Sequence, residues 1–84
     1  MFEVLLERAA EADLKRLSKE NFNRLIPHIR FLAQDPRPSG CRKLSGSPND
    51  WRIRIGDYRV LYEIDDKAKT VKVFRVKHRR EAYR

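Results

Sequence analysis

Three arginines lie close together in the second half of the chain, and their spacing indicates a site for an anion. They are Arg52, Arg54 and Arg59. The segment Trp51–Ile55 alternates apolar and basic residues, which is the pattern of a half-buried strand. Gly56-Asp57 follows with glycine first, which suits a type II′ turn of two residues. A hairpin is therefore expected, with Tyr58–Ile64 as the returning strand.

The register of this hairpin sorts its side chains onto two faces. A two-residue turn pairs Ile55 with Tyr58, so that Arg54 lies opposite Arg59. Successive pairs point to opposite sides of the sheet. One face then collects apolar residues, namely Trp51, Ile53, Ile55, Tyr58, Val60 and Tyr62. The other face collects Arg52, Arg54, Arg59 and Leu61.

Two arginines that face each other across strands repel, so the pair indicates an anion that bridges the guanidinium groups. Phosphate fits, because the planar guanidinium donates hydrogen bonds in pairs and stays charged at any working pH. The alternative is a solvated strand face on which Glu63 or Asp50 pairs with the arginines.

Further polar groups follow the last expected strand. His78 could act as a general acid or base near neutral pH, or it could be a surface histidine in a basic run. Tyr83 could stack on a base or orient a hydroxyl, or pack the tail against the sheet. Arg79 lies between them. Additional candidate phosphate contacts are Lys43, Lys77 and Arg80.

The elements that position these groups begin with a short apolar strand at Phe2–Leu6. Apolar residues at helical spacing then predict two helices. The first covers Ala9–Leu17, and the second runs from Phe22 to a point before Pro36. Pro27 must lie in the first turn of that helix or kink it. The segment 35–50 is rich in proline and glycine and is expected to be a loop.

The third late strand is expected at Thr70–Val76, where broken alternation indicates a central strand covered on both faces. The resulting order is β-α-α-β-β-β followed by a short tail. This is an α+β fold with an antiparallel sheet and two N-terminal helices packed on one of its faces. A chain of 84 residues has room for one core, so residues 1–84 are expected to form a single domain.

Charge divides the chain into two unequal halves. The formal net charge is +8, and residues 41–84 carry thirteen basic and six acidic residues against seven and six in residues 1–40. The first half therefore resembles a scaffold, and the second carries the positive field. Such a field predicts an anionic partner, which could be nucleic acid, an acidic protein or an anionic membrane.

Several classes of protein are disfavoured by what the sequence lacks. There is no run of about 18 apolar residues and no basic stretch before the first apolar segment, so neither a membrane span nor a signal peptide is expected. The cytoplasm is the default location. Cys41 is the only cysteine, which excludes an internal disulfide. Neither metal-ligand spacing nor a glycine-rich phosphate loop is present, and no cofactor is expected.

A family pattern is present in two stretches of the second half of the chain, KLSGSPNDWRIRIGDYRVLYEI and VKHRREAYR. They resemble the RelE/ParE superfamily of bacterial and archaeal toxins, and more narrowly its RelE branch. The similarity extends over the whole chain in length and in element order. It implies the toxin of a type II toxin–antitoxin system, which cleaves mRNA in the ribosomal A site without a metal by attack of a 2′-hydroxyl on the adjacent phosphate.

The resemblance also implies roles for single residues. Arg52 and Arg54 match the two basic residues of the family's second strand. Arg59 matches the arginine of its third strand. In the tail, Arg79 and Tyr83 match an arginine and a tyrosine. The best-known bacterial member has lysines in place of Arg52 and Arg54. Because arginine cannot give up its proton, the role of general base shifts to Tyr83 or His78.

The implied partners are an acidic, RelB-like antitoxin in a toxin–antitoxin hetero-oligomer, together with ribosomal RNA and the mRNA in the A site. No membrane partner is implied. Two other functions stay open. One is a ParE-like inhibitor of DNA gyrase, and the other is a catalytically silent protein of the same fold that only binds its antitoxin.

Overall fold

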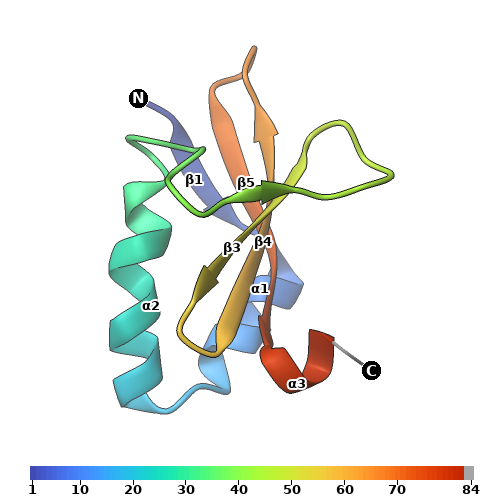
Figure 1. Ribbon diagram of the computed structural model, residues 1–84. Helices are drawn as coiled ribbons and strands as arrows, with labels where there is room; N and C mark the ends of the chain where they lie inside the picture. Colours follow the sequence, from blue (N-terminus) through green and yellow to red (C-terminus); the bar gives the residue numbers. More distant parts are fainter. Residues whose placement is uncertain (83–84) are drawn as a thin grey trace.

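The computed structural model describes residues 1–82 and contains five strands and three helices in this part of the chain (Figure 1). In chain order they are β1 (Glu3–Leu6), α1 (Arg8–Lys15), α2 (Lys19–Phe31), β2 (Arg42–Lys43), β3 (Asp50–Ile55), β4 (Tyr58–Asp65), β5 (Thr70–His78) and α3 (Arg79–Ala82). The α+β class and the order of the long elements match the prediction. Two elements, β2 and α3, were not expected.

The strands form one sheet in the order β1-β5-β4-β3-β2. The three long strands β3, β4 and β5 make the expected antiparallel meander. The prediction of a purely antiparallel sheet is wrong, because β1 pairs with β5 in parallel. A tight turn forces the two strands that it connects to be antiparallel. The connection between β1 and β5 is instead a long segment that contains both N-terminal helices and three strands. No local signal therefore sets their relative direction.

The hairpin of β3 and β4 has the predicted register at every position. Arg54 lies opposite Arg59, and Ile55 lies opposite Tyr58. In the turn, Gly56 has a φ of 59°, whereas Asp57 has no positive φ. A positive φ at the first turn residue alone distinguishes type II′ from type I′. Glycine takes this conformation without the steric cost of a side chain.

The strand β5 is central, as predicted, but its broken alternation has a different cause. Leu61 pairs with Arg75 and Tyr62 pairs with Val73, so Phe74 is an extra residue in the ladder. Such a β-bulge changes which residues point to each face. The bulge therefore explains the pattern, and no second covering layer is needed.

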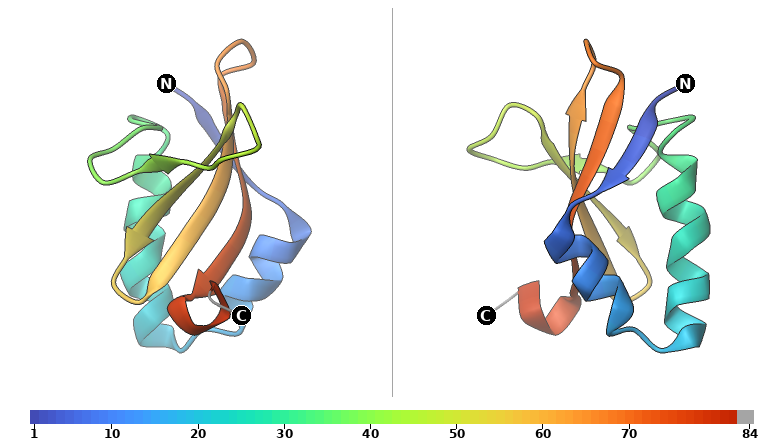
Figure 2. Two further views of the ribbon diagram at one scale, coloured as in Figure 1. Left: turned by 45° about the vertical axis from the view of Figure 1, so that its right-hand side comes forward. Right: turned by 180° about the vertical axis from the view of Figure 1, so that it is seen from behind.

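Both N-terminal helices lie on the same face of the sheet (Figure 2). They contribute to one apolar core there. Its buried members are Ala10, Leu14, Leu25, Ile29, Leu32, Ile53, Ile55, Val60, Tyr62, Ile64, Val71, Val73 and Val76. The opposite face of the meander carries the arginines. It is called the open face below.

The second helix begins three residues earlier than predicted. The hydroxyl of Ser18 accepts a hydrogen bond from the backbone N–H of Asn21 at 3.2 Å, which caps the helix before Lys19. Pro27 lies in the middle of α2 instead of in its first turn. It is exposed, so water can satisfy the carbonyl that loses its helical donor.

Asp13 fastens α1 to β5 at a point where the sheet ends on that side. The strand β1 pairs with β5 only as far as Val73, which leaves the backbone N–H of Val76 beyond its reach. The carboxylate of Asp13 accepts from this N–H at 2.9 Å and from Nε of Arg75 at 2.8 Å. This contact holds the end of β5, from which the tail departs.

The segment predicted as a continuous loop contains the short strand β2. It pairs with β3, placing Arg42 opposite Arg52 and Lys43 opposite Trp51. A two-residue strand between glycines and prolines leaves no periodic signal, which is why the pattern missed it. The start of the segment is held by Arg37, which binds Asp66 at 2.9 Å and lies 5.1 Å from the centre of the Trp51 ring.

Candidate nucleic-acid interface

A row of three cations crosses the open face near the hairpin turn. Arg54 on β3 lies opposite Arg59 on β4, and Arg59 lies opposite Lys77 on β5. Residues directly opposite in adjacent strands point to the same face. The first two positions follow the predicted register. The third position is held by Lys77. The sequence predicts it as a phosphate contact but does not predict its position in the row.

A second row lies two residues further from the turn. It runs from Arg42 on β2 through Arg52 on β3 to Leu61 on β4. The row ends at Arg75, which is engaged with Asp13. Sequence reasoning missed Arg42, because it lies in a segment that was expected to be a loop. The only sequence signal was its charge.

The next row carries the opposite charge. Asp50 lies opposite Glu63, and Glu63 lies opposite Lys72. Asp50 and Glu63, the candidate partners of the arginines, are thus neighbours of each other at the end of the hairpin away from the turn. Asp50 and Glu63 therefore mark the end of the positively charged part of the open face.

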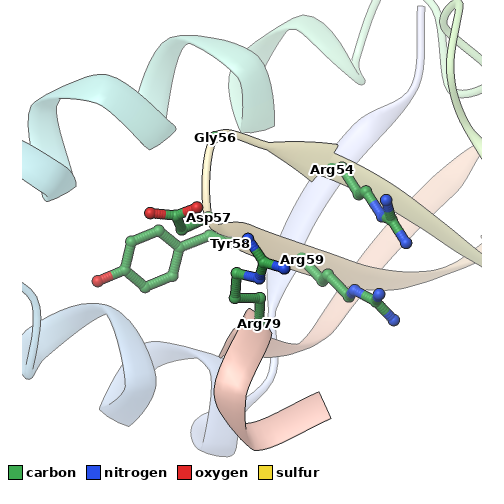
Figure 3. A pocket seen from close by; sticks show the side chains of 6 residues that line it. All are labelled: Arg54, Gly56, Asp57, Tyr58, Arg59 and Arg79. Carbon is green, nitrogen blue, oxygen red and sulfur yellow. The ribbon is translucent and has the colours of Figure 1, made fainter. Parts of the chain in front are cut away.

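A pocket of about 130 Å³ lies at the hairpin turn (Figure 3). Its lining residues are Arg54, Gly56, Asp57, Tyr58, Arg59 and Arg79. Arg79 belongs to the tail, and its backbone N–H donates to the carbonyl of Asp57 at 2.7 Å. This bond brings the tail back to the turn, so that Arg79 reaches the same pocket as Arg54 and Arg59. Three of the predicted site residues therefore meet here.

His78 lies elsewhere, with the side chains of the helix face. It is opposite Tyr58 in the sheet, and the two rings meet edge to face with centroids 5.2 Å apart. Its Nδ1 accepts a hydrogen bond from the backbone N–H of Arg80 at 3.2 Å. The neutral ring therefore carries its proton on Nε2. His78 does not share the face of Arg54 and Arg59.

The other predicted residues are spread around this centre. Lys43 lies opposite Trp51, and so it points to the face opposite that of Arg52. Arg80 is exposed on α3 and lines a shallow hollow with His78 and Arg79. Tyr83 lies outside the described residues.

Neither a metal cluster nor a membrane helix is present in residues 1–82. No group of three or more His, Cys, Asp or Glu side chains could hold an ion in this part of the chain. None of its helices is long and apolar enough to cross a membrane.

What this face can do follows from its charge and shape. Arginines from β3, β4 and the tail line one pocket that has room for a phosphate group. Fixed cations in such a place stabilise the extra negative charge that a phosphate gains when it is attacked. The face is therefore suited to binding phosphate, and to reactions at phosphorus.

Comparison with known proteins agrees with this description. Residues 4–83 match the family described as "ParE toxin of type II toxin-antitoxin system, parDE". The chain is 28% identical to the putative toxin RelE1 of Methanocaldococcus jannaschii over 86 aligned positions, which cover 99% of this chain and 96% of that protein. It is 46% identical to toxin RelG of Mycobacterium tuberculosis over 43 residues, which cover 51% of this chain and 46% of that one.

Solved structures give the same result for the fold. The archaeal RelE–RelB complex from Pyrococcus horikoshii OT3 contains a similar chain, with a TM-score of 0.82, 29% identity and coverage of 93% of this chain and 94% of that one. The isolated Escherichia coli RelE toxin has a TM-score of 0.81 at 21% identity, with coverage of 99% and 96%. The second likeness concerns the fold alone. Because the family match spans nearly the whole chain, this protein belongs to the RelE/ParE superfamily of toxins from type II toxin–antitoxin systems.

Proposed function

We propose that this toxin is a ribosome-dependent mRNA endoribonuclease that stops translation. The observation that carries the proposal is that Arg54, Arg59 and Arg79 all line one pocket at the hairpin turn. A scissile phosphate placed there would be held by three guanidinium groups from three separate elements. A protein that inhibits its target only by binding has no need of such an arrangement.

The reaction we propose needs no metal. The 2′-oxygen of the nucleotide before the cut forms a bond to phosphorus, and the bond from phosphorus to the 5′-oxygen of the next nucleotide breaks. The products are a 2′,3′-cyclic phosphate and a free 5′-hydroxyl. The proton of the 2′-hydroxyl passes to a base, and the leaving oxygen gains one. Arg54, Arg59 and Arg79, which line the pocket, stabilise the negative charge that builds up on the phosphate during the reaction, and Arg52 lies one row further from the turn on the same face.

The base in this proposal is Tyr83 or His78, and we favour Tyr83 because His78 lies on the other face of the sheet from Arg54 and Arg59. His78 points to the helix face, where its Nδ1 is occupied by the N–H of Arg80. The tail begins at the pocket, and Tyr83 follows Arg79 by four residues. Neighbouring guanidinium groups would favour the tyrosinate form, which can accept a proton.

The proposed partners are mRNA in the ribosomal A site, ribosomal RNA and an acidic antitoxin that resembles RelB, all in the cytoplasm. The antitoxin is supported by similar chains that were solved as RelE–RelB complexes. The net charge of +8 also favours an acidic partner that covers the arginines.

The direct test is a reconstituted translation reaction with a defined mRNA and the purified toxin. Primer extension should detect cuts within the coding sequence only when ribosomes are present. A single 2′-deoxy nucleotide at the mapped site should abolish the cut there and leave other sites unaffected. Cleavage that persists at the deoxy nucleotide would contradict attack by the 2′-hydroxyl.

The alternative is inhibition of DNA gyrase, and the family description that names ParE favours it. A supercoiling assay with purified gyrase separates the two functions. Inhibition of supercoiling together with intact mRNA in the translation reaction would support the gyrase function. A protein silent in both assays would be a toxin-fold protein that only binds its antitoxin.

A further inference from the structure

An apolar patch lies between the cations of the open face, and phosphate binding alone does not explain it. Leu61 on β4 and Leu44 after β2 are both half-buried. Together with Arg52, Arg59 and Lys77 they line a groove of about 200 Å³. Leu44 is held in place by its backbone N–H, which donates to the carbonyl of Asp50 at 2.8 Å. The groove thus has an apolar floor and a cationic rim.

A second hollow adjoins the arginines on the side of β2. It has a volume of about 440 Å³, and its lining includes Gly40, Arg42, Arg52 and Arg54. No side chain projects from Gly40, and Arg42 lies opposite Arg52. This hollow can receive an anion separate from the one in the pocket at the turn.

The two cationic rows are two residues apart along the strands, which corresponds to roughly 7 Å. Successive phosphates along a single-stranded nucleic acid have about this separation. The next row, which contains Asp50 and Glu63, is acidic and would repel a third phosphate. The open face therefore offers two adjacent phosphate positions, with the groove of Leu44 and Leu61 next to both.

We propose that this face binds one whole nucleotide beside the scissile phosphate of single-stranded RNA. The base lies on Leu44 and Leu61, and the further phosphate lies between Arg42 and Arg52. This subsite rests on the proposed endoribonuclease function and adds to it the path of the strand. Leucine side chains give a base van der Waals contact on its apolar face, with little preference for one base over another.

An acidic peptide is the other ligand class that matches these cations. Its carboxylates would satisfy the arginines, but a peptide of acidic residues has no apolar group to fill the groove of Leu44 and Leu61. A nucleotide supplies both phosphates and an apolar base, so it matches the cations and the groove together. RNA is therefore the favoured ligand, and an acidic peptide is an outcome that the experiment must distinguish.

The probe is a trinucleotide with 2′-O-methyl riboses, which cannot be cleaved by the proposed route. It is titrated into the purified toxin without ribosomes and followed by NMR of the leucine methyl groups. We expect the resonances of Leu44 and Leu61 to shift. A probe with an abasic central position should bind about fivefold more weakly, since base contact is lost. In Leu61→Thr this preference should disappear, whereas the matched control Leu5→Thr, on the edge strand β1, should keep it.

Charge is tested with a second pair of variants. Arg42→Gln should lower the slope of log Kd against log salt concentration by about 0.7, the value for one phosphate contact with a single strand. Arg30→Gln makes the same substitution at an exposed position on α2 and should leave the slope unchanged. Circular dichroism confirms that each variant is folded.

Three results would overturn the subsite. They are equal binding of the normal and abasic probes, no detectable binding of either, and tighter binding of a glutamate-rich peptide that is lost in Arg42→Gln. None of them depends on cleavage. A toxin that fails to cut mRNA but shows the expected binding pattern would refute the proposed function and leave the subsite intact.

Discussion

At the scale of single residues, the structure separates groups that adjoin one another in the sequence. His78 and Arg79 are consecutive, yet Arg79 lines the pocket together with Arg54 and Arg59, whereas His78 is not among its lining residues and packs edge to face on the Tyr58 ring. Lys43 and Arg42 are separated in the same way by the two faces of the sheet. The number of basic residues in a stretch of sequence is therefore larger than the number of cations that can reach one phosphate.

The first prediction concerns the arginines of the pocket. Arg59→Ala and Arg79→Ala should each lower the rate of mRNA cleavage by roughly a hundredfold or more, because each removes a donor to the charged transition state. The rate is measured by primer extension in the reconstituted reaction. Arg30→Ala, with an exposed side chain on α2, is the matched control and should cleave at the normal rate. Normal rates in both pocket variants would exclude the pocket as the catalytic centre.

The second prediction identifies the base. Tyr83→Phe removes a hydroxyl and should reduce cleavage by about a hundredfold, within the range measured for general acid–base groups. His78→Gln should stay within a few-fold of the normal rate, because His78 lies opposite Tyr58, on the other face of the sheet from Arg54 and Arg59. The two rates are compared over a range of pH. The reverse ranking would assign proton transfer to His78.

At the scale of elements, the position of the tail depends on how β5 is held. Asp13 of α1 binds both the side chain of Arg75 and the backbone of Val76, two residues before the strand ends. Burial disfavours the charged carboxylate, but the hydrogen bonds and positive charge of Arg75 outweigh it, so the pKa of Asp13 is lowered. The ion pair thus supports the end of β5, which carries Lys77 and leads directly into Arg79.

The third prediction follows from this pKa. A carboxyl group whose pKa is lowered by folding stabilises the native state above its unfolded pKa of about 3.9, and this stability is lost as pH falls through the folded value. Asp13→Asn should lower the free energy of unfolding by about 2 kcal/mol at neutral pH. The difference from the natural protein should shrink below about pH 4. Urea titrations at several pH values measure both effects.

Glu20→Gln is the matched control, because Glu20 is 85% exposed and lies 4.0 Å from Arg24 at the edge of ion-pair range. It should change stability little at any pH. A stability difference for Asp13→Asn that is independent of pH would mean that packing, instead of the charged hydrogen bonds, accounts for the loss.

At the scale of the whole molecule, the fold collects charge on one side. The helices and the core occupy one face of the sheet, and the two cationic rows occupy the other. The uneven charge of the two halves of the sequence thus becomes an uneven charge of two faces. Such a surface attracts anionic partners over distances that depend on salt.

The fourth prediction concerns an acidic antitoxin bound to this face. Its affinity, measured by calorimetry, should weaken as salt concentration rises, because the attraction between the two surfaces is screened. Arg52→Gln should reduce both the affinity and its salt dependence, and Arg30→Gln should change neither. An affinity that is the same at all salt concentrations would show that the antitoxin binds mainly through apolar contacts elsewhere.

The hairpin, its register and the face shared by Arg54 and Arg59 could be predicted from the local pattern of residues alone. These features depend on the alternation of side chains and on a two-residue turn, which are interactions between residues close along the chain. The family pattern added the likeness to RelE/ParE toxins, which the comparisons confirmed.

Which other segments join the hairpin could be learned only from the folded structure. β1 pairs in parallel with β5, Asp13 of α1 binds the end of β5, and Arg79 lies against the hairpin turn. These three contacts join segments that are far apart in the chain. The strand β2 with Arg42 is close to β3 in the chain, but two residues are too few to show a period. Local periodicity carries no information about such pairings, because they form only when the whole core packs. The register placed two arginines side by side, and the packing of the tail brought the third.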